Sequence, residues 1–453
     1  MASAPICIDD ILDRPEMGRY RWNIYIVCGL LMALEGYDAY IVSNLAPIVA
    51  RGLNIPIPSM GFIFTAQAAG MALGFYTVPI LADRIGRRGI MLIGAAAFGV
   101  LTIISAMVTT MESFAFVRFL GFFALGGTWP NIIALASEFM PESRRSRLLT
   151  WLFISHGMGA SFAGFVGPTF VALHSWQSAF WAGGIAMLIF VPFMARVLPE
   201  SIRYLVNRDG SDPRVGQILQ RVDPGLAWSS GDTFFTRETK VAGSTVFGLF
   251  RDGRAVMTML LWLGMGSSLY VTATLTAWLP SYLHVLGGLE TSTATRMSAF
   301  SALGSISGPV MLTYLMKRFG TPLALCLTCA GAFITMMGIS LVAEFPALGW
   351  GIGVCFGLLV VGAQAGLNSL VASSYPTSIR STGIGWAGGV GRLTSMIGPG
   401  VGGAILAAQL SPAIISFVVA GPMILAFIAM LAFHLLGISK LMPSTAQAET
   451  GKA

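Results

Sequence analysis

Residues 24–48 read IYIVCGLLMALEGYDAYIVSNLAPI, an apolar run that contains two acids, Glu35 and Asp38. A helix of about 20 apolar residues crosses a bilayer core of roughly 30 Å. The whole chain has this character, because 55% of its 453 residues are hydrophobic and only 10% are charged. Soluble proteins have about 45–50% apolar and 25% charged residues. The sequence therefore predicts a membrane protein.

Comparable apolar runs recur along the chain. Lipid leaves unpaired backbone groups unsatisfied, and the runs lack the alternating pattern of an outer-membrane barrel, so we expect helices and an all-α fold. The twelve expected spans are 22–48, 58–82, 89–110, 113–140, 148–172, 176–198, 255–284, 292–316, 321–343, 347–375, 381–408 and 411–438.

Basic residues are concentrated on one side of these spans. Of the 27 Lys and Arg residues, 22 lie in the N-terminal segment, the loops at 83–88, 142–147, 199–254, 317–318 and 380, and the C-terminal tail, whereas the opposite loops hold Arg51 and Arg296. Short cytoplasmic loops collect Lys and Arg, so both termini are expected in the cytoplasm. This bias explains the net charge of +7, and we expect no nucleic-acid partner. The first twenty residues do not resemble a cleaved signal peptide.

A long polar stretch divides the spans into six and six. We predict an N-terminal six-helix bundle at 1–198, a cytoplasmic linker at 199–253, and a C-terminal six-helix bundle with its tail at 254–453. DRIG at 83–86 is echoed by KRFG at 317–320, and PESRRS at 141–146 by PTSIRS at 376–381. Duplicated bundles place a ligand near the bilayer midplane and expose it alternately to each side. This organisation favours a transporter.

The two acids of the first span lie close to the level of a buried arginine. Helix rise places Glu35 about 16 Å and Asp38 about 21 Å above the inner boundary, and Arg118 about 24 Å above it. Glu35 and Asp38 share a helix face, where one of two neighbouring carboxylates can hold a proton near neutral pH. We interpret them as proton carriers with Arg118 as partner; a structural ion pair and direct substrate contact are the alternatives. His156 is either a rival carrier or a hydrogen-bonded fixture.

Arg392 lies about 18 Å into its span, near mid-membrane. No acid lies in the same span. A guanidinium can hold a carboxylate through two hydrogen bonds, so we expect Arg392 to bind an anionic ligand. Pairing with a helix carbonyl or a distant acid is the alternative.

Further charged residues lie at the inner rim, where Glu138 comes near Arg144 and Arg145 in the sequence. A salt-bridge latch is expected there, and the DRIGRR loop is expected to lock the inner mouth. The candidates for this cytoplasmic gate are Asp83, Arg84, Arg87, Glu138, Arg144 and Arg145.

Signals for catalysis or metal binding are absent. The chain has no H-E-x-x-H or G-x-S-x-G motif, and GIGWAG at 383–388 lacks the preceding strand of a dinucleotide site. CLTC at 326–329 has no second cysteine pair and no nearby histidine. We expect neither an enzyme, nor a cofactor, nor a metal site.

Several of these stretches resemble a known family. LADRIGRRGIML (81–92), RFLGFFALGG (118–127) and PESIRYL (199–205) resemble signatures of the major facilitator superfamily. The segments 34–47, 126–145 and 366–399 are similar to its bacterial aromatic acid:proton symporters. Those proteins usually read D-G-F-D in the first helix, so Glu35 replaces the first Asp and Tyr37 the Phe. In the second half, KRFGTP lacks the acid of DRIGRR, which limits the expected gate to the first half.

The resemblance implies import of a small aromatic carboxylate with protons across the bacterial inner membrane, by a protein that we expect to be a monomer. Aromatic faces stack on rings and amides bind ring hydroxyls, although ordinary packing is an alternative for each residue. Rival functions are a carrier of sugars or aliphatic acids and a receptor that does not transport. The substrate-contact candidates are Arg392, Trp129, Asn131, Gln364, Asn368, Trp386 and Tyr37.

Overall fold

The computed structural model describes residues 5–173, 175–229, 231–237, 246–251, 253–376 and 379–438. Eleven helical segments among these residues are long and apolar enough to cross a membrane, and they coincide closely with eleven of the twelve predicted spans. The remaining one, 381–408, forms the 28-residue helix α17 (Arg380–Ala407). Its many glycines and Arg392 lower the hydropathy of α17, which is not among those eleven segments.

The chain folds into two compact units. Unit 1 is built from Met1–Ile41, Ala66–Phe162 and Thr169–Lys240, and unit 2 from Val42–Thr65, Ala163–Pro168 and Val241–Ala453. Each is described below by itself.

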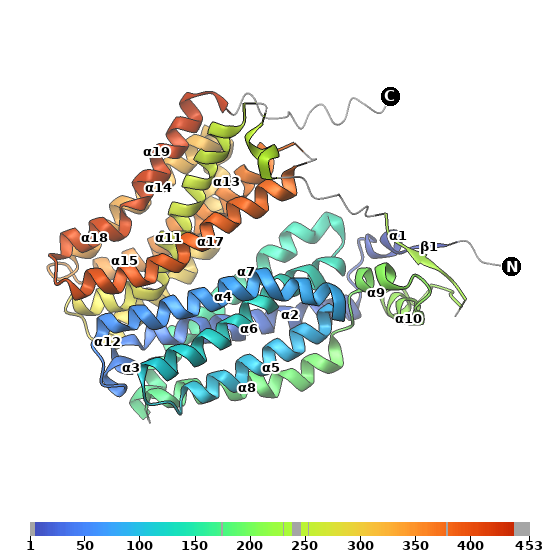
Figure 1. The fold of residues 1–453 in the computed structure, drawn as a ribbon, viewed down its shortest axis with the longest axis horizontal. Coiled ribbons are helices and arrows are strands. Elements are labelled where there is room, and N and C mark those ends of the chain that lie inside the picture. Colours follow the sequence, from blue (N-terminus) through green and yellow to red (C-terminus); the bar gives the residue numbers. More distant parts are fainter. Residues whose placement is uncertain are drawn as a thin grey trace. The chain divides into compact units, whose positions relative to one another are not determined.

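Long helices that run alongside one another form the body of unit 1 (Figure 1). Helix α5 packs against both α6 and α8, and buried apolar side chains from α2 and α5–α8 form a core that continues into the N-terminal segment and the linker. These helices are α2 (Arg19–Asn44), α4 (Met60–Ile85), α5 (Arg87–Ser105), α6 (Met111–Glu138), α7 (Glu142–Leu173) and α8 (Trp176–Val197).

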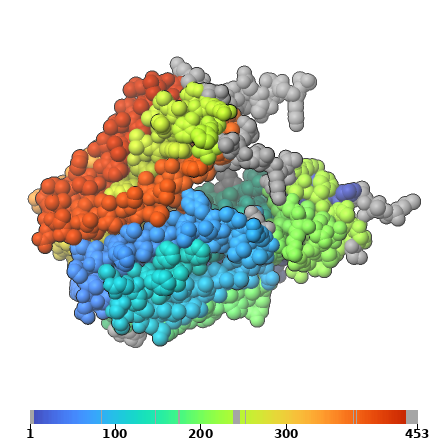
Figure 2. All heavy atoms as spheres, in the orientation of Figure 1, coloured from blue at the N-terminus to red at the C-terminus, as the bar shows by residue number. Residues whose placement is uncertain are grey.

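The described residues of 5–12 and 199–237 form a small module at one end of unit 1, which we call the linker module. It contains a short parallel strand pair, in which Ile6 lies opposite Phe234 and Cys7 opposite Phe235; the sequence predicts no strand there. Figure 2 shows the linker residues of this module in light green, gathered at this end. The elements of the module are β1 (Ile6–Cys7), α1 (Ile8–Leu12), α9 (Ile202–Arg208), α10 (Pro213–Val222) and β2 (Phe234–Phe235).

Unit 2 is organised around α11, which packs against α17 and α19. Several predicted spans are interrupted, for example by a π-helical turn, η4, between α15 and α16. The elements after the linker are η2 (Val246–Phe250), α11 (Ala255–Val285), α12 (Thr291–Ala299), α13 (Ser301–Phe319), α14 (Thr321–Met337), η3 (Gly338–Leu341), α15 (Leu348–Cys355), η4 (Phe356–Val361), α16 (Gly362–Ser374), α17, α18 (Pro412–Ala420) and α19 (Pro422–Leu435).

Unit 2 also includes α3 (Ala46–Gly52), η1 (Ile57–Ser59) and the first turns of α4. Helix α4 crosses α17 closely at Gly61, where an added Cβ would lie 3.1 Å from the Gly403 Cα and 3.2 Å from the Pro399 carbonyl oxygen. Trp278, which is fully buried, packs edge-on against Phe64 and donates a 2.8 Å hydrogen bond to that same Pro399 oxygen. We call this contact the Gly61–Gly403 crossing.

Candidate functional site

Asp38 and Arg118 form an ion pair inside unit 1, as the helix-rise argument predicts. The Arg118 Nη2 donates to Asp38 Oδ2 at 2.7 Å and to the Asp38 carbonyl oxygen at 3.2 Å. Both side chains are almost fully buried, with exposed fractions of 1% and 3%. The guanidinium also lies over the rings of Phe122 and Phe180, at 5.1 and 5.7 Å. These contacts offset part of the cost of removing the two charges from water.

Two polar atoms of the pair remain available for another partner. Asp38 Oδ1 and Arg118 Nε are buried and have no hydrogen-bond partner among the described residues. On the same helix, Glu35 is also buried, and its Oε2 likewise has no such partner. Within a transmembrane helix, ionisable groups of this kind are a mark of function.

Helix α7 approaches these acids through two glycines. A Cβ at Gly36 would overlap the His156 carbonyl oxygen, and a Cβ at Gly159 would overlap the Ala33 carbonyl oxygen. The backbones of α2 and α7 therefore approach closely at these two glycines, as small residues permit in membrane helices. It holds the His156 side chain directly against α2.

The three substrate-contact candidates of unit 1 contact different parts of the unit. Trp129 packs edge-on against His156, with ring centroids 5.3 Å apart. Asn131 is buried and donates its amide to the Gly127 carbonyl of its own helix at 2.7 Å. The Tyr37 hydroxyl donates to the Ala179 carbonyl of α8 at 3.0 Å. Asn131 and Tyr37 thus bond to backbone carbonyls, whereas the Trp129 Nε1 has no hydrogen-bond partner among the described residues.

The candidates of unit 2 are less enclosed. Arg392 is half-buried and Asn368 is exposed. Gln364 accepts a 3.1 Å hydrogen bond from the Ser268 hydroxyl. Trp386 is 45% exposed and stacks on Trp262 with centroids 6.0 Å apart.

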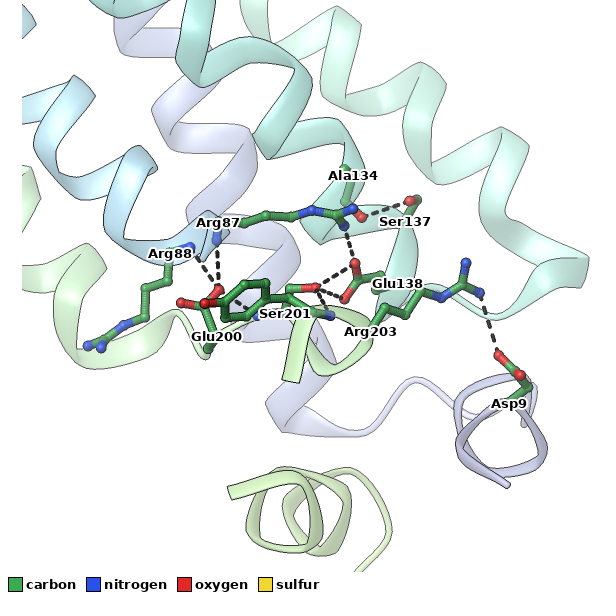
Figure 3. Close-up of polar contacts among 10 residues, drawn as sticks. Asp9, Arg87, Arg88, Ala134, Ser137, Glu138, Glu200, Ser201 and Arg203 are labelled. Atoms are coloured by element: carbon green, nitrogen blue, oxygen red, sulfur yellow. Dashed lines mark hydrogen bonds and ion pairs between the residues drawn. The ribbon is translucent and has the colours of Figure 1, made fainter. Parts of the chain in front are cut away.

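Two of the expected gate residues, Arg87 and Glu138, lie at the end of unit 1 that carries the linker module (Figure 3). Glu138 forms an ion pair with Arg87 and accepts hydrogen bonds from the Ser201 hydroxyl at 2.8 and 2.9 Å. Glu200 accepts from the backbone N–H groups of Arg87 and Arg88 at 2.8 and 3.1 Å. This carboxylate thus caps the first turn of α5.

The partner of Glu138 differs from the expectation. Its ion pair joins it to Arg87 of the neighbouring helix, whereas Arg144 is exposed and Arg145 lies 3.5 Å from Asp13. Helix α7 begins just after Glu138 and carries both arginines away from it, so nearness in the sequence did not give nearness in space. Arg84 is exposed, and the side chain of Asp83 lies outside the described residues.

Sequence reasoning missed the linker's part in this network. Ser201 and Glu200 come from PESIRYL, and Arg203 of the same motif lies 3.5 Å from Asp9 of the N-terminal segment. The motif was visible as a family signature, but its partners lie more than 60 residues away along the chain.

Comparison with known proteins identifies the family. The family model described as "Major Facilitator Superfamily" matches residues 28–399. The chain belongs to the major facilitator superfamily. A solved structure of the Escherichia coli xylose transporter XylE, in a partially occluded inward-open conformation, has the same fold, with a TM-score of 0.70 at 16% identity over 95% of this chain and 99% of that one.

Curated relatives within the superfamily are transporters. A gallate transporter from Pseudomonas putida is 29% identical over 95% of each chain. The 4-hydroxybenzoate transporter PcaK from Acinetobacter baylyi is 31% identical over 87% of each chain. This chain is accordingly a multi-pass membrane protein of a transporter family and not an enzyme.

Proposed function

We propose that this superfamily member imports an aromatic carboxylate together with protons across the bacterial inner membrane by alternating access. The observation that carries the proposal is the buried Asp38–Arg118 pair, with Glu35 one helical turn away and Oε2 of that acid lacking a described partner. Acids of this kind can bind and release a proton as their surroundings change between two states. The names of the relatives support an aromatic acid as the solute.

The proposal gives each half of the chain one task. Residues 1–198 carry the acids, and residues 254–453 supply Arg392 for the substrate carboxylate, with the segment 199–253 as a cytoplasmic linker. We propose that α17 crosses the membrane as a twelfth span, that both termini are cytoplasmic, and that the protein works as a monomer. The carboxylate of the substrate would bind to a cation, and the ring of the substrate would pack on an aromatic surface.

Uptake into proteoliposomes tests the proposal directly. Purified protein should accumulate labelled 4-hydroxybenzoate when the lumen is more alkaline than the medium, and coupling to one proton permits up to about tenfold accumulation per pH unit. Competition by benzoate-like compounds but not by hexoses or aliphatic acids would separate an aromatic carrier from its rivals. A protein that binds the acid yet never loads the vesicles would be a receptor.

Two variants separate coupling from folding. Asp38→Asn and Glu35→Gln should abolish accumulation against a gradient while counterflow exchange continues, because neither amide can carry the proton. Asp38→Asn also leaves Arg118 without its carboxylate, at a cost of about 3–5 kcal/mol when a buried charge loses its partner. Glu35→Gln breaks no ion pair found among the described residues, so it is the cleaner test. Loss of exchange and accumulation together in Glu35→Gln would indicate a structural role.

A further inference from the structure

Two ring nitrogens in unit 1 are buried without hydrogen bonds. They are Trp129 Nε1 on α6 and His156 Nδ1 on α7, and neither has a partner among the described residues. Leaving such a group unsatisfied costs about 1–3 kcal/mol, and the bilayer core holds no water to compensate. Two unsatisfied nitrogens on rings that touch each other suggest a partner that is bound in only part of the transport cycle.

The two rings belong to an aromatic group that we call the Trp129 cluster, composed of Tyr40, Trp129, Phe153 and His156. Trp129 lies edge-on to His156 and 5.8 Å from Phe153, and Tyr40 lies 6.1 Å from His156. The rings of Trp129 and His156 are half-buried and Phe153 is 46% exposed. The cluster therefore has open aromatic surface on which a planar ring can pack.

The cluster adjoins the part of α2 that carries the acids. His156 Nδ1 would lie 2.9 Å from a Cβ at Gly36, the residue that follows Glu35. A solute held at the cluster would therefore be close to the segment proposed to carry protons.

We propose that the Trp129 cluster binds the ring of the substrate and recognises a ring hydroxyl. The Trp129 indole N–H donates to the hydroxyl oxygen, and the hydroxyl donates its proton to an unprotonated nitrogen of His156. Both nitrogens are closed to solvent in this conformation, so His156 must turn its side chain to admit the hydroxyl. This inference rests on the proposed function and narrows its substrate class to hydroxylated aromatic acids. Sites that pair with a hydroxyl reject analogues that lack it, because their polar groups are then left unpaired.

Binding of paired ligands tests the inference. Dissociation constants of benzoate, 3-hydroxybenzoate and 4-hydroxybenzoate are measured on the purified full-length protein. The wild type should bind one hydroxylated compound more tightly than benzoate. His156→Phe and Trp129→Phe keep an aromatic ring but lose the nitrogen, and each should reduce this preference about tenfold while benzoate binding changes less than about twofold.

Controls distinguish recognition from packing. Trp181→Phe on α8, a 40% exposed tryptophan of the same unit, should leave the preference unchanged. His156→Gln, which restores hydrogen-bonding atoms, should recover part of the preference and serves if His156→Phe does not fold. Equal weakening of all three ligands, or a wild type with no preference for a hydroxyl, would overturn the inference alone. A wild type that binds none of the three would overturn the proposed function as well.

Discussion

At the scale of the residue, Asp38 illustrates how a carboxylate is tolerated within a transmembrane helix. Arg118 compensates its charge directly, and the guanidinium lies over the rings of Phe122 and Phe180. The pairing uses one carboxylate oxygen and leaves the other buried without a described partner. Replacing such a pair by apolar residues often stabilises a protein, so its presence here argues for a task in transport.

Arg392→Ala should weaken binding of benzoate about 10- to 100-fold, because hydrogen bonds to a charged group contribute about 1.5–3 kcal/mol. Isothermal titration on purified protein measures the change. Arg296→Ala, which removes an exposed arginine at the end of α12, is the matched control and should bind normally. An unchanged dissociation constant for Arg392→Ala would remove this residue from the binding site.

Single residues were predictable from the sequence where helix geometry alone decides their place. Counting the rise along two antiparallel helices placed Asp38 and Arg118 at similar depth, and the ion pair confirms it. The partner of Glu138 was not predictable in this way. It depends on which helix packs beside α6 and on where α9 lies, and neither is encoded in residues near Glu138.

At the scale of the element, the crossing of α2 and α7 depends on glycine. Gly36 and Gly159 each face a backbone carbonyl of the other helix, and no side chain fits there. The crossing fixes the distance between the acids of α2 and the His156 ring.

Gly159→Leu should destabilise unit 1, because its side chain would have to displace the α2 backbone. Overpacking typically costs about 1–3 kcal/mol, and thermal unfolding in detergent should show the lower midpoint. Gly157→Leu is the control on the same helix, since a Cβ at Gly157 meets nothing within 4 Å. Similar midpoints for the two variants would mean that α2 and α7 do not cross as described.

Helix α10 provides a pH-dependent test in the linker module. Asp212 accepts at the helix start from the Arg214 N–H at 2.9 Å, and hydrogen bonding from the Arg214 side chain lowers the pKa of this carboxyl below its usual 3.8. Because this pKa is lower in the folded protein than in the unfolded chain, the ionised carboxyl stabilises the folded protein above pH 3.8. The stabilisation is lost as the pH falls through the lower pKa of the folded protein.

Asp212→Ala should therefore destabilise α10 by about 1 kcal/mol near neutral pH. Hydrogen exchange of residues 213–222 should be faster in the variant at pH 7, and the difference from wild type should shrink in acid. Asp212→Asn keeps a capping oxygen and should exchange more slowly than Asp212→Ala. A difference that is the same at both pH values would exclude a contribution from the charge.

The sequence predicted the long helices well because twenty consecutive apolar residues leave few alternatives in lipid. The interruptions were not predicted, among them η4 and the break between α12 and α13 at Phe300. Such breaks depend on packing against neighbouring helices. The strand pair of the linker module was missed for a similar reason, since each strand has only two residues.

At the scale of the whole molecule, alternating access requires contacts that form in one state and break in the other. We expect the Gly61–Gly403 crossing to be such a contact, because residues 42–65, which precede the linker in the chain, lie against α17 within unit 2. The crossing leaves no room for a leucine side chain at Gly61. A larger side chain at this position would therefore favour a state in which α4 and α17 are apart.

Gly61→Leu should therefore lengthen the distance between spin labels at Asn54 and Gln409, two exposed loop residues of unit 2. Double electron–electron resonance in detergent or nanodiscs measures this distance. Gly351→Leu adds the same side chain where a Cβ meets nothing within 4 Å, and it should leave the distance unchanged. Identical distributions for wild type and Gly61→Leu would show that the crossing does not separate.

The pairing of Ile6 with Phe234 has a consequence for biosynthesis. The first strand emerges from the ribosome long before its partner, and all six helices of the first half are synthesised between them. Strand β1 can therefore pair only after the linker has been translated. A bulky fusion at the N-terminus would hinder this late step, whereas one at the C-terminus would not.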